Sequence, residues 1–544
     1  MSIKCDDDPL TQMSEFKLPE IAADAQPGFT DSAGCAAWLA ELPLANVAPA
    51  QTRLLDQLRA LNRFQLPAAE RLKILEVLRE PAYFLQEHQV KKLAGKPLPL
   101  TQVERGIFGQ VVDFWQELLI GYQRCLVEAG EGWHKEQSAL ACQRALDCVA
   151  SSMFDHCRVY HAIPDAYWLD LHLLFRNIEA AGAAATAVAD PVRKVDASCA
   201  EVYVRALLFA LANPNEQLQK QLTQIQRWLE RWAQHVPVLR APPEKQNLPP
   251  LLLDDSAAAG AYRESDAGSR KASAWLDTGE LARILQKCVV LLRKGEPPAR
   301  LGLGEDCAMP GVEQLLLLLF RVWCEGKNVR TQGRRGANAK AQVCTTLMSI
   351  YYHISGKSFR QPGPATTLTR QQREEIATFG HASTRQEEAY VEAGGYAIEE
   401  WKLLEESLSG LRIARAPGPG GARFAHGQLI AVRPADAKNF LIGVVRWVMA
   451  DRDGGVELGV RIVPGVPQAI AVRPTGVNLK PERFAPALFC PPLAALSVQP
   501  SLILPPGWYR PQRVLEIYGE KKLLLSGVIE HGIDFDRVSI EPAP

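Results

Sequence analysis

Arginines gather on a short stretch that has neither helical nor strand periodicity. Arg330 and Arg334 are four residues apart, Arg335 follows directly, and Gly333 interrupts the run. Guanidinium groups are planar forks that bind phosphate oxygens bidentately and stack on flat rings. Two or three of them on one flexible basic tether therefore suit a ligand that carries both phosphates and bases.

A carboxylate, a hydroxyl and a glycine follow later in the chain, at Glu405, Ser407 and Gly410. A carboxylate accepts hydrogen bonds from two neighbouring N–H donors on a guanine edge, and a glycine lets the backbone come close to a ligand. The two segments together offer cations for phosphates, flat surfaces for bases and an acceptor for a base edge.

These residues resemble the signature of the PilZ domain family, bacterial receptors for the second messenger cyclic di-GMP. Arg330 and Arg334 match the Arg-x-x-x-Arg element, and Ser407 and Gly410 match the Asp/Asn-x-Ser-x-x-Gly element. Glu405 stands at the acidic position, which keeps the charge and adds one methylene. The resemblance covers about residues 325–475. It implies a small antiparallel β-barrel that binds cyclic di-GMP and an output in motility, pili, biofilm formation or surface attachment. The ligand-binding residues that we predict are Arg330, Arg334, Arg335, Glu405, Ser407, Gly410 and Arg446.

Arg446 and two further residues, Trp447 and Arg412, are second-rank candidates for the same site. Arg446 lies between Val445 and Trp447, and strand alternation that buries both neighbours directs Arg446 outward. Arg446 then either reaches a phosphate or pairs with an acid on the next strand. We interpret Trp447 as a core residue, and Arg412 as a second candidate for phosphate binding.

Composition indicates a soluble multidomain protein. The 544 residues correspond to three or four domains at roughly 100 to 200 residues each. Lys+Arg and Asp+Glu balance at 61 each, so no global field attracts nucleic acid or an anionic membrane. Any anion site must therefore be local, as in the basic segment 321–340.

The chain shows no pattern of export or membrane insertion. It begins without a basic and then apolar signal pattern, and the longest strictly apolar run, 206–212, is far shorter than the ~20 residues that span a bilayer. The 12 cysteines are scattered singly, without a Cys-x-x-Cys pair. We expect a cytoplasmic protein with free buried thiols and no metal site.

Periodicity changes along the chain. Apolar residues recur at helical spacing up to about residue 325, and Thr101 with Glu104 forms a capping box before a long helix. Short alternating strands dominate after residue 428. We predict a multidomain α + β protein with an all-α array or bundle followed by a PilZ-like antiparallel β-barrel. The expected regions are a disordered arm at 1–30, a helical domain at 31–236, a linker with connecting helices at 237–325, the barrel at 326–475 with an insertion at about 355–395, and a β extension at 476–544.

Several function classes remain open. The sequence has no Walker loop, no nucleophile elbow and no kinase motif set, so we expect no enzyme activity. The main interpretation is a receptor whose helical domain binds an unidentified protein partner. A scaffold or adaptor with a degenerate barrel is the first alternative. A nucleic-acid binder is a third class, which the balanced charge disfavours.

Overall fold

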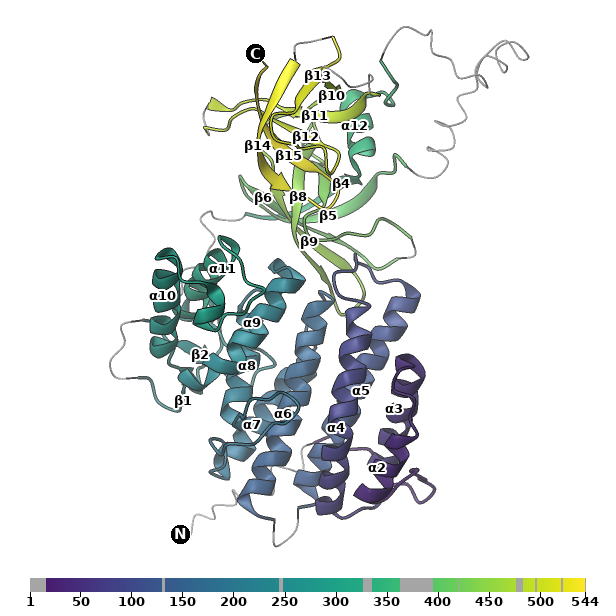
Figure 1. Ribbon diagram of the computed structural model, residues 1–544, viewed down its shortest axis with the longest axis vertical. Helices are drawn as coiled ribbons and strands as arrows, with labels where there is room; N and C mark the ends of the chain where they lie inside the picture. Colours follow the sequence, from purple (N-terminus) through teal and green to yellow (C-terminus); the bar gives the residue numbers. More distant parts are fainter. Residues whose placement is uncertain are drawn as a thin grey trace, which may run out of the picture. The chain divides into compact units, whose positions relative to one another are not determined.

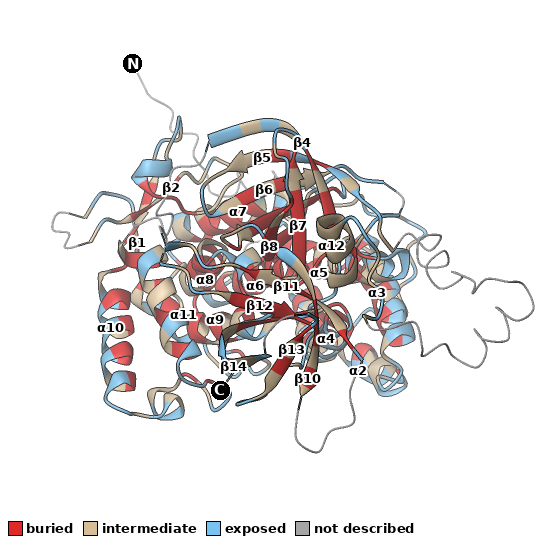
Figure 2. Ribbon diagram, turned by 90° about the horizontal axis from the view of Figure 1, so that it is seen from above, coloured by how far each residue is buried: buried red, intermediate tan, exposed pale blue. Residues whose placement is uncertain are grey.

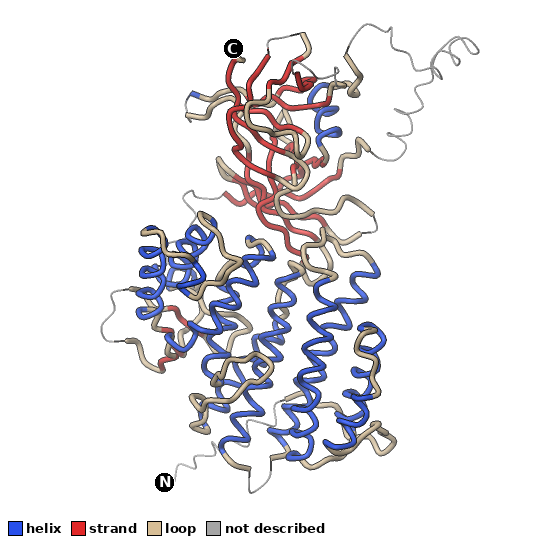
Figure 3. Tube along the Cα trace, viewed as in Figure 1, coloured by secondary structure: helices blue, strands red, loops and turns tan. Residues whose placement is uncertain are grey.

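The chain folds into two compact units. The helical unit comprises residues 1–96 and 100–331, and the barrel unit comprises residues 97–99 and 332–544. Figure 3 shows helices throughout most of the first unit and strands in most of the second. The predicted fold class, an all-α region followed by antiparallel β-barrel structure, is confirmed. The computed structural model describes residues 16–129, 133–243, 248–325, 335–362, 395–418, 420–475, 483–494, 497–519 and 522–543.

Amphipathic helices build the first unit, as the apolar spacing predicts (Figure 1). The predicted capping box begins its longest helix: Thr101 Oγ1 accepts from the Glu104 amide at 3.3 Å, and the Glu104 carboxylate accepts from the Thr101 amide at 2.8 Å. Two amides of the first turn are thereby satisfied. The helices are α2 (Ser32–Ala40), α3 (Val47–Arg63), α4 (Ala68–Lys91), α5 (Gln102–Val127), α6 (Lys135–Arg158), α7 (Asp165–Ala180), α8 (Cys199–Leu211) and α9 (Gln219–Trp232).

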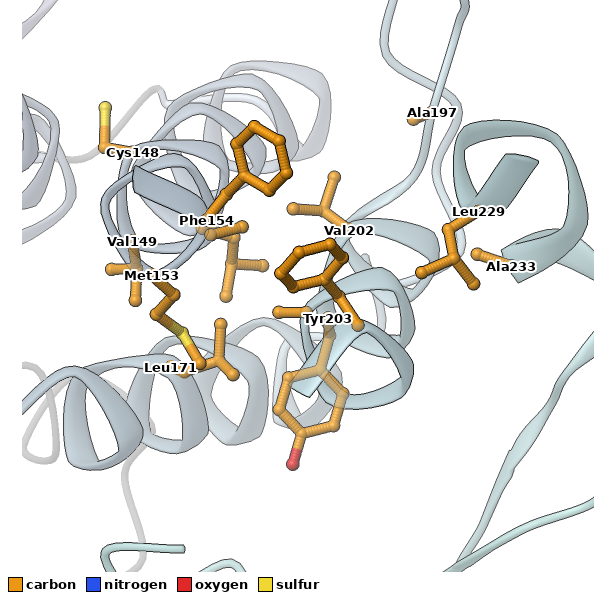
Figure 4. Packing of buried hydrophobic residues seen from close by; sticks show 14 of the residues in the cluster. Cys148, Val149, Met153, Phe154, Leu171, Ala197, Val202, Tyr203, Leu229 and Ala233 are labelled. Atoms are coloured by element: carbon orange, nitrogen blue, oxygen red, sulfur yellow. The ribbon is translucent and has the colours of Figure 1, made fainter. Parts of the chain in front are cut away.

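A continuous apolar core joins these helices. In Figure 4, Met153 and Phe154 of α6 lie near Leu171 of α7 and near Val202 and Tyr203 of α8, and all five side chains are buried. Burial of one such large side chain contributes about 1.5–3 kcal/mol to folding. The array therefore derives its stability from contacts between helices.

Residues 237–325 belong to this core, whereas the sequence predicts a linker with connecting helices. Leu251, Leu285 and Leu316 are completely buried within the same cluster as the long helices. Figure 2 shows buried and exposed stretches alternating along the amphipathic α10. The sequence does not reveal the core positions on the strands of this proline-rich region, because strands of only two or three residues are too short to show an alternating apolar pattern. The elements are β1 (Val238–Leu239), β2 (Leu251–Leu253), β3 (Ala274–Leu276), α10 (Gly279–Arg293), α11 (Gly311–Phe320) and a π-helical turn (Arg321–Glu325).

The predicted disordered arm is wrong for residues 16–30. Phe16 and Phe29 are buried in the helical core, and the carbonyl of Pro19 accepts a hydrogen bond from Arg124. Two aromatic anchors outweigh the absence of helical periodicity that suggested disorder. Residues 1–15 lie outside the described part of the chain.

A buried ionic network ties several helices together. Asp147 of α6 is fully buried, and its carboxylate pairs with Arg79 of α4, with Arg205 of α8, and with Arg193, which precedes α8. The Arg193 guanidinium lies 2.9 Å from Asp147 Oδ1, and that of Arg79 lies 2.6 Å from Asp190 Oδ2. Such a network is costly to break because each buried charge depends on its partner.

A second buried carboxylate, Asp155 of α6, is expected to make the helical unit pH-dependent. Burial raises the pKa of Asp155 to about 6, although Arg158 and the Trp115 indole, which donates at 2.8 Å, act in the opposite direction. Because the folded pKa of Asp155 lies above its unfolded value, the contribution of this one group to stability is most favourable below about pH 4 and becomes less favourable as the pH rises to 6.

Asp155→Asn removes this titration and keeps an acceptor for Trp115. We expect the variant to exceed the wild type in free energy of unfolding by about 2 kcal/mol at pH 7, and to equal it near pH 4. Urea denaturation of both proteins at the two pH values, followed by far-UV circular dichroism, measures the difference. A difference that does not change with pH would contradict the prediction.

The first barrel closes from six antiparallel strands in the order β4-β5-β6-β9-β8-β7. Three of its strands, at 429–434, 441–450 and 456–462, lie in the region after residue 428 where alternation predicts short strands. Alternating apolar residues such as Leu411, Ile413 and Leu458 fill its interior. The strands are β4 (Arg335–Thr345), β5 (Glu399–Glu406), β6 (Gly410–Arg415), β7 (Leu429–Pro434), β8 (Leu441–Ala450) and β9 (Val456–Ile462), and α12 (Leu347–Ser355) follows β4.

The predicted β extension forms part of a second closed barrel, with the order β10-β11-β12-β15-β14-β13. Its first strand, β10, falls inside the region 326–475 that the sequence assigns to the first barrel. It hydrogen-bonds with β11 and β13 instead. Leu429 and Val444 of the first barrel share a buried cluster with Leu488 and Ile503 of the second. The strands are β10 (Gln468–Thr475), β11 (Ala485–Cys490), β12 (Ser501–Leu504), β13 (Val514–Ile517), β14 (Lys522–His531) and β15 (Asp536–Pro542).

The cysteines of the described ranges are all buried and form no disulfide, as predicted. Burial raises the pKa of most of them, which suppresses their reactivity. In the same ranges, no group of three or more potential metal ligands comes together. None of the described helices is long and apolar enough to cross a membrane.

Candidate ligand site on the first barrel

The predicted Ser-x-x-Gly element forms the tight hairpin between β5 and β6. The Ser407 amide donates to the Gly410 carbonyl at 2.9 Å, and Ser407 Oγ accepts from the Gly410 amide at 3.1 Å. A Cβ atom at Gly410 would lie 3.0 Å from the Val460 carbonyl oxygen of β9. Gly410 therefore permits a close approach to β9, whereas the sequence interpretation expected a close approach to a ligand. Ser407 and Gly410 both determine the shape of the hairpin.

A polar row crosses four neighbouring strands beside this hairpin. Glu405 lies opposite Arg412, Arg412 lies opposite Gly459, and Gly459 lies opposite Trp447. The neighbours of Arg412 on β6, Leu411 and Ile413, are buried, so the row faces outward. A side chain at Gly459 would overlap the Trp447 ring. Glycine therefore lets the indole lie flat against β9.

Trp447 is partly exposed, which corrects its interpretation as a core residue. A β-bulge in β8 shifts the register between Val445 and Trp447, so the alternation used for the sequence interpretation fails there. Arg446 is the extra residue of this bulge and is 53% exposed, so its predicted outward direction is confirmed. The bulge thus exposes two consecutive residues, the cationic Arg446 and the aromatic Trp447, on the outer surface.

Two carboxylates hold Arg412. Its Nη1 lies 3.0 Å from Glu405 Oε1, and its Nη2 lies 2.7 Å from Glu457 Oε2. Burial opposes the charge of the guanidinium, but Glu457 and then Glu405 outweigh this and raise the pKa of Arg412. Glu405 was predicted to accept from a base edge, and in the structure its carboxylate accepts from Arg412. A fixed, fully charged guanidinium beside an indole suits an anionic ligand with flat rings.

Arg461 lies on the same outer face, two residues after Gly459 along β9. It lies opposite Gly410 on β6 and forms an ion pair with Glu530 of β14. Arg446 approaches the same carboxylate, with 3.9 Å between Arg446 Nη1 and Glu530 Oε1. The alternation Val456, Leu458, Val460 already directs Arg461 outward, so the sequence contained the signal for it.

The arginines of the predicted tether are only partly described. Arg335 is the first residue of β4 and is not in a loop, because its backbone pairs with Glu406 of β5. Its side chain is 82% exposed, and its Nη2 lies 2.5 Å from Glu406 Oε1. Arg330 and Arg334, and most of the predicted insertion at 355–395, lie outside the described residues.

Comparison with known proteins adds independent information. Residues 33–243 match the family model for the N-terminal domain of the cyclic-di-GMP receptor FimW, and residues 470–543 match the model for the FimW C-terminal β-barrel domain. The second match coincides with the second barrel. The chain is 24% identical over 521 residues to the cyclic-di-GMP receptor FimW of Pseudomonas aeruginosa, covering 86% of this chain and 83% of that protein. The chain is therefore a homologue of the cyclic-di-GMP receptor FimW, and its regions match the N-terminal and C-terminal domains of that receptor.

Proposed function

We propose that this chain binds cyclic di-GMP on the outer face of its first barrel. The observation that carries the proposal is the row in which Trp447 lies over Gly459 beside the clamped Arg412, with Arg446 and Arg461 nearby. A bis-phosphate, bis-guanine ligand needs cations for its phosphates and flat surfaces for its bases. The homology to a cyclic-di-GMP receptor supports the same ligand.

In this proposal each residue has a defined role. Arg330, Arg334 and Arg335 bind phosphates or stack on bases, and Arg446 and Arg461 contribute further cations. The Ser407 and Gly410 hairpin fixes the edge of the site. Glu405 acts through Arg412, because the 3.0 Å contact already engages its carboxylate. The proposed site requires no metal and no cofactor.

The proposed output is signalling without catalysis in the bacterial cytoplasm. The helical unit ends its last described stretch in the π-helical turn, where Trp323 is fully buried and its indole donates to the Leu208 carbonyl at 2.8 Å. Because the end of the helical unit is anchored in this way, it suits a role in which a change at the barrel is transferred to a partner surface on the helical unit. Control of motility, pili or surface attachment is the process class that the family resemblance suggests.

A scaffold with a degenerate barrel is the second candidate. It is favoured by the carboxylates that already engage Arg335, Arg412 and Arg461. In that case the arginines serve the barrel's own stability, and a nucleotide meets three described arginines that carboxylates already engage. The two candidates differ in whether the purified chain binds cyclic di-GMP.

Calorimetric titration of cyclic di-GMP into the full chain tests the proposal. We expect micromolar or tighter binding, and a loss of roughly 10- to 100-fold for Arg330→Ala and for Arg334→Ala, since each charge-assisted contact is worth about 1.5–3 kcal/mol. Arg300→Ala, which removes an exposed arginine of the helical unit, is the matched control and should bind like the wild type. GTP should give no heat. Absence of binding by the correctly folded wild type would favour the scaffold.

A further inference from the structure

Glu530 of the second barrel reaches two arginines of the first. Its carboxylate forms an ion pair with Arg461 of β9 and lies 3.9 Å from Arg446 of β8. Both arginines border the face that carries Trp447 and Arg412. The second barrel therefore contributes a negative charge to the edge of the proposed ligand site.

Local backbone geometry directs both partners toward this contact. Arg446 is the extra residue of the bulge in β8, and a bulge in β14 lies between Val528 and Glu530. Bulges re-aim side chains and recur near functional sites because a regular strand would alternate past such a position. Without the bulges, the regular alternation of the two strands would direct the side chain of Arg446, of Glu530 or of both away from this contact.

A third arginine adds to the positive charge around Glu530, where the second barrel also carries the carboxylates of Asp534 and Asp536. Arg537 lies opposite Glu530 in the β14–β15 pairing and is buried, with its Nε donating to Ser501 Oγ at 3.1 Å. The side chains of Arg446 and Arg461 contact the Glu530 carboxylate, and Arg537 lies beside Glu530 on the neighbouring strand. Burial lowers the pKa of Arg537, which is the response of a cation that is incompletely compensated.

We propose that Glu530 is an intramolecular competitor for the ligand's phosphate, so that the second barrel lowers and regulates the affinity of the first. This inference rests on the proposed function. In the ligand-free protein the carboxylate occupies Arg446 and Arg461. A phosphate takes the same guanidinium groups, and Glu530 then loses its partners. Coupling of this kind is reciprocal, so ligand binding weakens the contact between β14 and β9 by the same factor by which the contact weakens binding.

The test compares three full-length proteins: wild type, Glu530→Gln and Glu516→Gln. Glu516 is the matched control, because it pairs with Arg473 at 2.9 Å within the second barrel and is also a partly exposed strand residue. Calorimetry with cyclic di-GMP should show binding by Glu530→Gln that is roughly 5- to 30-fold tighter than wild type, and unchanged binding by Glu516→Gln. A fourth protein, Glu530→Asp, keeps the charge and shortens its reach, so its affinity should fall between those of the wild type and Glu530→Gln.

Hydrogen exchange gives a second readout that does not depend on affinity. Cyclic di-GMP should increase amide exchange in β14 of the wild type and leave β14 of Glu530→Gln unchanged. Equal or weaker binding by Glu530→Gln, in a chain whose wild type binds, would overturn the competitor role and leave the receptor function intact. Failure of all three proteins to bind would instead overturn the receptor function itself.

Discussion

Asp147→Ala is expected to lower the free energy of unfolding of the helical unit by about 3–5 kcal/mol. The carboxylate of Asp147 is fully buried and pairs with Arg79, Arg193 and Arg205. The Tyr83 hydroxyl donates to it as well. Removal of the carboxylate leaves three guanidinium groups with fewer partners in an apolar interior, where an uncompensated charge is strongly unfavourable.

The effect should depend on pH in a defined direction. Burial by itself would raise the pKa of Asp147, but Arg193, Arg205 and Arg79 outweigh it and hold that pKa well below its usual range. A depressed folded pKa contributes stability above the unfolded value of about 4, and this contribution is lost as the pH falls. The difference between wild type and variant should therefore be full at pH 7 and shrink steadily below pH 4.

Urea denaturation followed by far-UV circular dichroism measures this difference, because the helices dominate the signal. Asp113→Ala provides the control: Asp113 also pairs with an arginine, Arg59, at 2.7 Å, but its side chain is half exposed. An exposed pair is worth at most about 1 kcal/mol, so the control should be nearly neutral. Similar small losses for both variants would show that the network around Asp147 does not hold the helices together.

Local patterns are sufficient to predict most elements of this fold. The spacing of Leu54, Leu58 and Leu61 predicts α3, and the Thr101 capping box predicts the start of α5. Alternation predicts β8 and β9. These features depend on interactions within a few residues, so the sequence contains them directly. Closure of the second barrel is different, because β10 must find β13 some forty residues later, as in the pairing of Val472 with Ile517.

The candidate site could be predicted only in part. Arg446 and the Ser407–Gly410 element follow from the motif resemblance and alternation. Trp447 was assigned to the core because no local signal marks the bulge that displaces it. Glu530 lies on another barrel, and its contact with Arg461 depends on how the two barrels pack. Partners that meet through tertiary packing leave no pattern in the sequence of either strand.

The role of the clamped guanidinium yields the second large effect: Arg412→Ala should weaken cyclic-di-GMP binding roughly 30-fold or more. The substitution removes a cation and leaves Glu405 and Glu457, which now hold it at 3.0 and 2.7 Å, as two unpaired carboxylates beside a ligand with two phosphates. The two carboxylates then repel the phosphates of the ligand, and this part of the site changes from cationic to anionic.

Two further variants separate this mechanism from simple unfolding. Arg473→Ala breaks an equivalent arginine–glutamate pair on the second barrel, where Arg473 is 29% exposed against 34% for Arg412, and should bind normally. Adding Glu457→Gln to Arg412→Ala removes one of the repelling charges, so the double variant should recover part of the lost affinity, because the loss arises from charge. Arg412→Lys should not replace arginine fully, since a point charge cannot contact both carboxylates in the forked geometry. If Arg412→Ala bound as tightly as the wild type, or if the double variant bound more weakly than Arg412→Ala alone, the clamped guanidinium would have only a structural role in the barrel.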